Sequence, residues 1–330
     1  MACRAALRCR GAPASSWGAP QVRRCTAVLS AAGTPAQSPS VGGASAYEAR
    51  LLSALGSKFD AAAVARVRES LELTLAGREF HADHGDEGPQ EAHSYVRGLQ
   101  ASPWHDPSEH AWARALAAEW ETPARELRAS LDPAQADKLR QRGYRVWAPA
   151  AREEGAAYGE DWRTLVLMDR GSWDEANAAM FPETVELIKR AGVPAQEVFF
   201  AKQPAGTGIA PHTDGCNFVM TSHLGLDVPH EDERCWMRVG KDKRPWANGG
   251  ILMCDTSFEH ETYNDAETDR YVLLIRHWHH DLTKTERKAL QWIFDALADA
   301  SMPPGKVKVR KATNSAAKAK AKRKGFGAKS

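Results

Sequence analysis

Between residues 163 and 278, short apolar runs alternate with clusters of glycine, proline, asparagine and aspartate. Runs of this length, bounded by turn-forming residues, are typical of β-strands. A series of many short strands favours two packed sheets, as in a sandwich or a jelly roll. The sequence predicts strands at 164–168, 197–202, 217–226, 235–239, 251–254 and 271–278.

Helical patterns flank and interrupt these strands. Apolar residues recur at helical spacing within 51–73 and within 112–131, which predicts an N-terminal helical layer. Residues 81–108 show no regular period, and we interpret them as irregular. A helix is predicted at 183–191, and an amphipathic helix at 283–298 closes the strand-rich region. The chain is therefore expected to be mainly β with α.

These patterns predict one folded domain between two polar ends. Its core of 160–282 lies between a helical layer and a closing helix. The predicted parts are a transit peptide and linker at 1–46, a domain at 47–305 (helical layer 47–150, β core 160–282, closing helix 283–300) and a basic tail at 306–330.

The first 47 residues contain five arginines and no acidic residue. They lack the continuous apolar run of a secretory signal, so their composition is typical of an organellar transit peptide. The stretch at 22–28, Val-Arg-Arg-Cys-Thr-Ala-Val, resembles the processing region of plastid transit peptides. We therefore favour the plastid (chloroplast) over the mitochondrion, and an extension without any address is the remaining interpretation.

Residues 306–330 contain ten lysines or arginines and no acidic residue. Between the two basic ends, the chain has 29 basic and 42 acidic residues, which gives a net charge of −13. The domain itself therefore gives no reason to expect nucleic-acid binding. The tail is predicted to be disordered, and its contact with nucleic acid or an anionic surface is the less favoured interpretation. No apolar run approaches membrane-spanning length, so a soluble protein is expected.

Three residues form a candidate metal site. In an extended strand, side chains at positions i and i+2 point to the same side, so His212 and Asp214 would aim an imidazole and a carboxylate at one point. His260 would supply a third ligand. Two histidines and one carboxylate on one face of an octahedron are typical of non-haem Fe(II) oxygenases. Arg270 would offer a planar, permanently charged fork suited to a carboxylate.

The surroundings of these residues resemble the aspartyl/asparaginyl β-hydroxylase family. The resemblance lies in residues 211–229, which begin Pro-His-Thr-Asp-Gly-Cys-Asn, in 255–261, Asp-Thr-Ser-Phe-Glu-His-Glu, and in the tryptophan-containing stretches at 235–240 and 276–282. It implies a double-stranded β-helix core and a hydroxylase that uses Fe(II), 2-oxoglutarate and O₂, with ascorbate as reductant. It also implies that His212, Asp214 and His260 are the catalytic metal ligands, and that Arg270 and His223 bind 2-oxoglutarate.

The chain departs from the animal members of this family and is similar to plant, algal and bacterial members with a complete triad. Asp214 stands where the animal enzymes have glycine, Ala201 where they have a serine near 2-oxoglutarate, and Thr221 where they have a substrate-contacting arginine. The expected substrate is therefore left open between a protein Asp or Asn side chain and a small or lipid-linked acyl group.

Other interpretations remain at each position. His212 and Asp214 could form a surface turn, His260 and His223 could be packed core histidines, and Arg270 could begin a strand in a salt bridge. The whole domain could be a cupin-like metal-binding protein without oxygenase turnover, or a binding module in which the basic tail recruits nucleic acid and the β core is vestigial. Asn217 could orient the site or hold a turn, and Trp236 and Trp246 are expected to pack. The irregular spacing of His81, His84, His93, His105 and His110 does not favour a second metal site.

Overall fold

The computed structural model describes residues 46–133, 148–149, 163–229 and 233–298. The predicted transit peptide and linker, up to residue 45, and the predicted basic tail at 306–330 lie outside these residues and stay predictions. The helices are α1 (Ala46–Lys58), α2 (Ala65–Leu75), α3 (Ala111–Ala118), α4 (Glu121–Leu131), α6 (Glu175–Ala178), α7 (Pro182–Ala191) and α8 (Lys284–Ala298), with short 3-10 turns η1 (Gly85–Glu87) and η2 (Pro107–Glu109).

The strands follow in chain order. They are β1 (Phe80–Asp83), β2 (Pro89–Ala92), β3 (Trp104–His105), β4 (Ala148–Pro149), β5 (Arg163–Asp169), β6 (Ser172–Trp173), β7 (Ala195–Gln203), β8 (Thr207–His212), β9 (Val219–Asp227), β10 (Cys235–Val239), β11 (Asp242–Pro245), β12 (Ile251–Cys254), β13 (His260–Asn264) and β14 (Arg270–Trp278).

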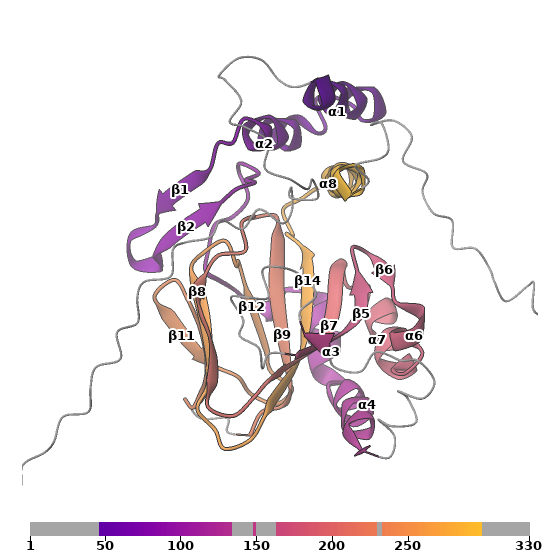
Figure 1. The fold of residues 1–330 in the computed structure, drawn as a ribbon, viewed down its shortest axis with the longest axis vertical. Helices are drawn as coiled ribbons and strands as arrows, with labels where there is room; N and C mark the ends of the chain where they lie inside the picture. The colour runs from indigo at the N-terminus through magenta and orange to yellow at the C-terminus, as the bar shows by residue number, and fades with distance from the viewer. Residues whose placement is uncertain (1–45, 134–147, 150–162, 230–232, 299–330) are drawn as a thin grey trace, which may run out of the picture.

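Strands β7 to β14 form a double-stranded β-helix. The larger sheet runs β3-β12-β9-β14-β7-β5-β4 and the smaller sheet β11-β10-β13-β8. Apart from the β10–β11 hairpin, consecutive strands from β7 onward alternate between the two sheets, and the last strand, β14, returns to pair with the first, β7. The pairings among these strands are antiparallel. The predicted jelly-roll class is confirmed, and Figure 1 shows the two sheets facing each other.

The sequence located β5, β7, β9, β12 and β14 of the larger sheet and β10 of the smaller sheet well. Each of the six predicted strands is present, with ends that differ by two residues or fewer. Strands β8, β11 and β13 of the smaller sheet were not predicted, because they are short and rich in polar residues. The prediction that 81–108 are irregular was wrong in part, since β1 and β2 form an antiparallel hairpin there and β3 joins the larger sheet.

Alternation along β14 separates two of the three apolar cores. Val272 and Leu274 point into the space between the sheets, whereas Leu273 and Ile275 point to the outer face of the larger sheet. Helices α3, α4 and α7 cover that outer face. Helices α1, α2 and α8 enclose a third core at one end of the sheets, as Figure 1 shows. The N-terminal helices therefore lie in two groups rather than in one layer.

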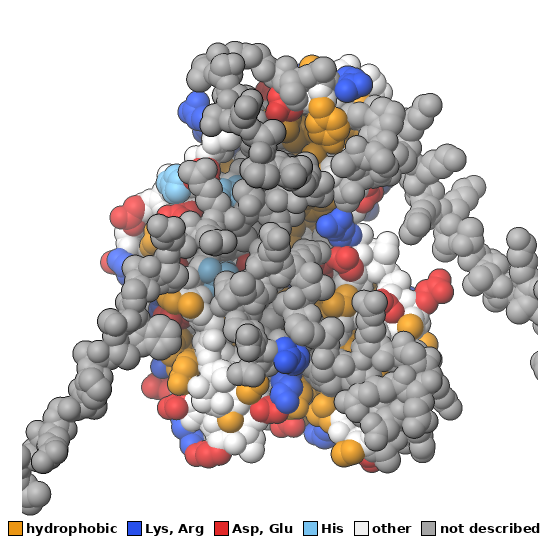
Figure 2. Space-filling view, in the orientation of Figure 1, with side chains coloured by type: hydrophobic (Ala, Val, Ile, Leu, Met, Phe, Trp, Pro, Cys, Tyr) orange, Lys and Arg blue, Asp and Glu red, His pale blue; other side chains and the backbone are white. Residues whose placement is uncertain are grey.

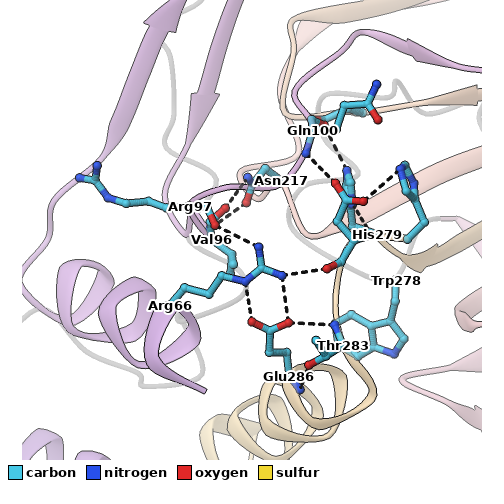
Figure 3. A network of polar contacts seen from close by, with 12 residues as sticks. Arg66, Val96, Arg97, Gln100, Asn217, Trp278, His279, Thr283 and Glu286 are labelled. Carbon is cyan, nitrogen blue, oxygen red and sulfur yellow. Dashed lines mark hydrogen bonds and ion pairs between the residues drawn. The ribbon is translucent and has the colours of Figure 1, made fainter. Parts of the chain in front are cut away.

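A buried carboxylate ties this third core together. Glu286 accepts a hydrogen bond from the backbone N–H of Thr283 at 2.8 Å, and the Thr283 hydroxyl accepts one from the Glu286 N–H at 3.2 Å, which is a capping box at the start of α8. The same carboxylate binds the Arg66 guanidinium of α2 through two oxygens, at 2.5 and 2.9 Å. Arg66 also donates to the carbonyls of Arg97 and Asp281 (Figure 3). One ion pair thus joins α2, α8 and the end of the β-helix.

On the face shown in Figure 2, acidic and basic side chains are interspersed over the described surface. Within the part of the chain that the structure describes, none of the helices is both long enough and apolar enough to cross a membrane.

Replacing Arg66 with methionine should lower the free energy of unfolding by about 2 kcal/mol at pH 7, because the Glu286 carboxylate loses two charged hydrogen bonds while it stays buried. Burial opposes ionisation of Glu286, but the hydrogen bonds from Arg66 and Thr283 outweigh it and lower its pKa. A carboxyl group with a lowered pKa stabilises the fold above its unfolded pKa, near 4.3, and this stability is lost as the pH falls through the folded pKa.

The difference between wild type and Arg66→Met should therefore be largest at neutral pH and shrink below about pH 4. Urea unfolding at a series of pH values measures it. The matched control is Arg68→Met, since Arg68 forms an exposed i,i+4 pair with Glu72 on the same helix and should cost about 0.5 kcal/mol or less. Equal losses in the two variants would contradict the assigned role of Arg66.

Candidate metal and co-substrate site

The structure brings His212, Asp214 and His260 together at the open end of the smaller sheet. A ligand atom from each residue lies within 4.8 Å of the others. His260 begins β13 and stands opposite His212, the last residue of β8, with ring centroids 4.1 Å apart. Nε2 of His212 lies 3.9 Å from Oδ1 of Asp214. The three side chains that the sequence singled out therefore form one cluster.

A register shift aims His212 at this cluster. Ile209 of β8 faces the interior and pairs with Thr262, so regular alternation would turn Pro211 inward and His212 outward. The pairing shifts by one residue between Thr262 and His260, which places His212 opposite His260 on the inner side. Proline has no N–H for the ladder, which makes this stretch tolerant of the irregularity.

Asp214 reaches the cluster from a loop rather than from the strand. β8 ends at His212, so the predicted i and i+2 relation within one strand is only partly right. The backbone N–H of Asp214 donates to the carbonyl of Thr256 at 2.8 Å, and Gly215 follows in a left-handed conformation with φ +75°. Residues just before β13 thus hold the loop that carries the carboxylate.

Backbone carbonyls select the ring form of both histidines. Nδ1 of His212 lies 2.8 Å from the carbonyl of Ala210, and Nδ1 of His260 lies 3.0 Å from that of Phe258. A carbonyl only accepts, so each Nδ1 carries the proton and donates, which leaves each Nε2 with a lone pair for a metal. In each histidine, a hydrogen bond from Nδ1 to the carbonyl of the residue two positions earlier fixes the orientation of the ring.

The charges at the cluster suit a divalent cation. Burial works against ionisation of Asp214, but Arg276, His260, His212 and a hydrogen bond from Thr256 together lower its pKa to about 2. Burial and the neighbouring His212 lower the pKa of His260 to about 3. At neutral pH the carboxylate is therefore ionised and the His260 imidazole neutral, which are the forms that bind a metal.

Arg276 orients the carboxylate and was not identified from the sequence. Its Nη2 lies 3.5 Å from Oδ2 of Asp214, whereas Oδ1 faces His212. Arg276 stands on β14 and pairs across the sheet with Thr221. One carboxylate oxygen is thus held by a guanidinium and the other is directed at the two imidazoles, which favours a single metal–oxygen bond. Only strand pairing reveals this contact, since Arg276 lies 62 residues from Asp214 in the sequence.

Arg270 begins β14 and is buried in the interior of the β-helix. It is 2% exposed, and its Nε and Nη1 atoms have no hydrogen-bond partner among the described residues. The guanidinium carbon lies 3.9 Å from the ring centroid of Trp246. Burial lowers the pKa of Arg270 to about 9, so the group is still a cation at neutral pH. A buried cation without a counter-ion is costly, and a ligand carboxylate would neutralise it.

His223 and Trp246 complete this pocket. The two rings stack with centroids 5.8 Å apart and planes 7° from parallel. Nδ1 of His223 and Nε1 of Trp246 are buried without a partner among the described residues. Burial lowers the pKa of His223 to about 3, followed in effect by Arg270 and His260. The His223 imidazole is therefore neutral at neutral pH.

Trp246 was expected only to pack, and its place under Arg270 gives it a further role. The loop that carries it passes close over β9: a Cβ on Gly225 would lie 2.1 Å from the carbonyl oxygen of Ala247. The backbone N–H of Trp246 donates to the carbonyl of Cys235 at 3.0 Å. Glycine at 225 is thus required for the approach that brings the indole beneath the guanidinium.

Other singled-out residues have structural roles. The Asn217 side chain accepts from the N–H of Val96 at 2.9 Å and donates to its carbonyl at 3.0 Å, which is the structural alternative (Figure 3). Trp236 faces outward from the smaller sheet, with the Lys243 ammonium 4.3 Å from its ring centroid. Thr221 lies inside and its hydroxyl is 3.3 Å from that of Thr256.

The five-histidine group of the sequence does not form one cluster. His81 and His93 lie near Glu79 on the surface, and His84 contacts Gln90. His105 and His110 lie elsewhere, beside histidines of the C-terminal end of β14.

Comparison with known proteins finds a family that is similar to this region of the chain. Residues 118–280 match the family model described as Aspartyl/Asparaginyl beta-hydroxylase. The matched segment includes β7 to β14 and each residue of the metal cluster and of the co-substrate pocket. Over these residues, about half of the chain, the sequence is similar to that family.

The curated relatives are distant, and the chain matches only part of each of them. Aspartyl/asparaginyl beta-hydroxylase from Homo sapiens is 29% identical over 208 residues, which is 59% of this chain and 25% of the human protein. Ornithine lipid ester-linked acyl 2-hydroxylase from Rhizobium tropici is 29% identical over 114 residues, 34% of this chain and 40% of that protein. The chain thus spans about a quarter to two fifths of the length of these relatives.

Among solved structures, a 2OG-Fe(II) oxygenase family oxidoreductase from Burkholderia pseudomallei is 14% identical, with a TM-score of 0.31 over 46% of this chain and 80% of that one. A predicted oxalate decarboxylase from Thermotoga maritima is 14% identical, with a TM-score of 0.25 over 36% of this chain and 80% of that one. The fold is assigned from the strand order itself.

Replacing Arg270 with methionine should raise the free energy of unfolding of the ligand-free protein by about 1–3 kcal/mol, because a buried cation without a counter-ion gives way to an apolar chain of similar length. Chemical unfolding without added carboxylates measures it. The matched control is Arg244→Met, since Arg244 also lies over a tryptophan, Trp104, but is 44% exposed and should change stability by less than about 0.5 kcal/mol. A loss of stability in Arg270→Met would show that the guanidinium has a partner within the protein.

Proposed function

We propose that this protein is an Fe(II)- and 2-oxoglutarate-dependent hydroxylase of an unactivated C–H bond. The observation that carries the proposal is the pairing of two features inside one β-helix. One is the cluster of His212, Asp214 and His260, in which each histidine binds a backbone carbonyl through Nδ1, and the other is the buried cation of Arg270. The residues fit Fe(II), since two imidazoles and one carboxylate leave coordination positions open.

The interior pocket supports 2-oxoglutarate as co-substrate. A metal-binding protein without turnover needs the three ligands but gains nothing from a buried, uncompensated guanidinium, which destabilises the fold. Arg270 would hold the far carboxylate with two parallel hydrogen bonds, and the Trp246 ring would hold the planar guanidinium in place. The neutral imidazole of His223 can donate a hydrogen bond to the same carboxylate without adding a second charge. The pocket thus favours an oxygenase over a simple metal-binding protein.

Bound Fe(II) together with 2-oxoglutarate and O₂ would supply the oxidation that converts C–H to C–OH, with release of succinate and CO₂. His212 and His260 would hold the metal through Nε2, and Asp214 through the oxygen that Arg276 leaves free. Apolar side chains between the two sheets, among them Val272 and Leu274, exclude water from the Arg270 end of the pocket. Exclusion of water strengthens the electrostatic hold on the co-substrate.

For the substrate, we propose a protein Asp or Asn side chain or an acyl group that is small or linked to a lipid. The two relatives described above support both classes, since one is named for aspartyl and asparaginyl residues and the other for an ester-linked acyl chain. Thr221 lies inside the β-helix near Arg276, so this part of the site offers a hydroxyl and a guanidinium.

Purified full-length protein should release succinate from 2-oxoglutarate when Fe(II), ascorbate and O₂ are present. Asp214→Asn should reduce this release at least tenfold, because the amide is neutral and a weaker metal ligand. The control is Asp227→Asn, the same change at an exposed residue at the end of β9. Succinate release by the wild type and the two variants is compared by mass spectrometry. Release equal in all three proteins would come from free iron and would argue against the hydroxylase.

Binding of the co-substrate can be tested without turnover. With Mn²⁺ and without O₂, 2-oxoglutarate should raise the unfolding temperature of the wild type by several degrees, since a ligand at 100 times its Kd stabilises by about 2.7 kcal/mol. Arg270→Met should show no such increase. 2-Oxobutyrate, which lacks the far carboxylate, should stabilise both proteins equally and weakly. Equal stabilisation of both proteins by 2-oxoglutarate would exclude Arg270 as the carboxylate-binding residue.

A further inference from the structure

The N-terminal β1–β2 hairpin lies against both segments that carry the metal ligands. Residues 89–96, which form β2 and the stretch after it, contact the loop that carries Asp214 and the turn that precedes His260. They lie outside residues 118–280, the segment that matches the family model. The surroundings of the metal cluster therefore include a part of this chain that the family match does not cover.

Backbone contacts hold the loop that carries the carboxylate ligand. The N–H groups of His93 and Ser94 both donate to the carbonyl of Gly215, at 2.8 and 3.1 Å. Further along, the Asn217 side chain is bound to the backbone of Val96 in both directions (Figure 3). The stretch after β2 thus fixes the chain just beyond the carboxylate.

The side chain of Gln90 in β2 holds the turn at 255–258, just before β13. Gln90 is completely buried. Its Nε2 donates to Oδ2 of Asp255 at 3.2 Å and to the hydroxyl of Ser257 at 2.9 Å. Oδ1 of Asp255 in turn accepts from the N–H and the hydroxyl of Ser257, at 2.9 and 2.5 Å. The amide, the carboxylate and the hydroxyl form one closed network that defines the shape of the turn.

The neighbours of Gln90 fix the direction of its amide. A carboxylate accepts hydrogen bonds, so the NH₂ group faces Asp255. Oε1 then faces Nε2 of His84 at 3.0 Å, and this nitrogen donates. A neutral amide suits this position because it donates on one side and accepts on the other, whereas a carboxylate here would face the carboxylate of Asp255.

The turn that Gln90 holds also orients two of the metal ligands. The carbonyl of Thr256 accepts from the backbone N–H of Asp214 at 2.8 Å, and the carbonyl of Phe258 lies 3.0 Å from Nδ1 of His260. Thr256 stands between the two residues that bind the Gln90 amide. A change in the turn therefore moves both carbonyls, and with them the carboxylate and one imidazole.

We propose that Gln90 is a positioning residue for the metal cluster. Its amide fixes the turn at 255–258, and the turn holds Asp214 and His260 in the arrangement that binds the ion. The inference rests on the proposed function, since the ion is the cofactor of that hydroxylase. The N-terminal hairpin is thus a part of the metal site, and a change at Gln90 alters the affinity for the metal in a protein that is still folded.

An exchange of the two partners separates positioning from general stability. Gln90→Glu sets a carboxylate against that of Asp255, and Asp255→Asn sets one NH₂ group against another, because its oxygen must still accept from Ser257. The double variant restores a donor and an acceptor in the reverse sense and keeps the net charge of the protein. Gln90→Met removes the hydrogen bonds without adding a charge.

The metal-free full-length proteins are titrated with Co²⁺, whose visible absorption reports both affinity and coordination geometry. The titrations are made at about pH 8, because burial raises the pKa of Asp255 to about 7 against the hydrogen bonds from Ser257 and Gln90. Gln90→Glu, Gln90→Met and Asp255→Asn should each weaken Co²⁺ binding about 10–100-fold and change the spectrum. The double variant should regain the wild-type spectrum and an affinity within about threefold of the wild type.

The matched control is Glu126→Gln. Glu126 accepts from the backbone N–H groups of Glu183 and Thr184 and from the Thr184 hydroxyl, so it joins α4 to α7 on the outer face of the larger sheet. Its replacement should lower the unfolding temperature and leave Co²⁺ binding unchanged. Circular dichroism of each metal-free variant shows that it is folded at the temperature of the titration.

Wild-type Co²⁺ affinity in the folded Gln90→Met and Asp255→Asn variants would overturn the positioning role, and so would a double variant that binds no better than the single ones. An equal loss of affinity in Glu126→Gln would assign the effect to stability and would also overturn it. If the wild type itself binds no Co²⁺, the proposed hydroxylase fails together with this inference, so the two failures are distinguished by the first titration.

Discussion

The antiparallel pairing of β13 with β8 is the constraint on which the rest of the site depends. It places His260 opposite His212, and the loop before β13 holds the backbone of Asp214 through the carbonyl of Thr256. A shift of one residue in this pairing turns His212 from the outer side to the inner side of the smaller sheet. The metal cluster is therefore a property of strand register, and not of the His-x-Asp spacing alone.

The interior of the β-helix combines apolar packing with a buried charge that lowers the stability of the fold. Val272 and Leu274 pack between the sheets on the same strand that carries Arg270, whose guanidinium is buried without a counter-ion among the described residues. The ring of Trp246 offsets only part of that cost, since a cation over an aromatic face contributes about 2 kcal/mol even when desolvated. Such a group lowers the stability of the ligand-free fold and favours the binding of a ligand with the opposite charge, which is a common compromise at binding sites.

Polar contacts join the N-terminal elements of the domain to the segment that follows β14. Glu286 caps α8 and binds Arg66 of α2, so the N-terminal helices are held against the helix that follows the β-helix. At the same end of β14, His280 and Asp281 face His105 from the segment before α3. The strand that carries Arg270 and Arg276 thus leads directly into the contacts that join the domain's first and last elements.

The sequence by itself determined which residues form the candidate metal cluster, and it located the longer strands of the larger sheet, β5, β7, β9, β12 and β14. Each of these follows from local periodicity or from the chemistry of a single side chain. The tertiary structure alone decided the inward turn of His212, the hold of Arg276 on Asp214, the place of Trp246 under Arg270 and the meeting of His105 with His280. The reason is that strand register and loop approach depend on packing between segments far apart in the chain, which local patterns do not encode.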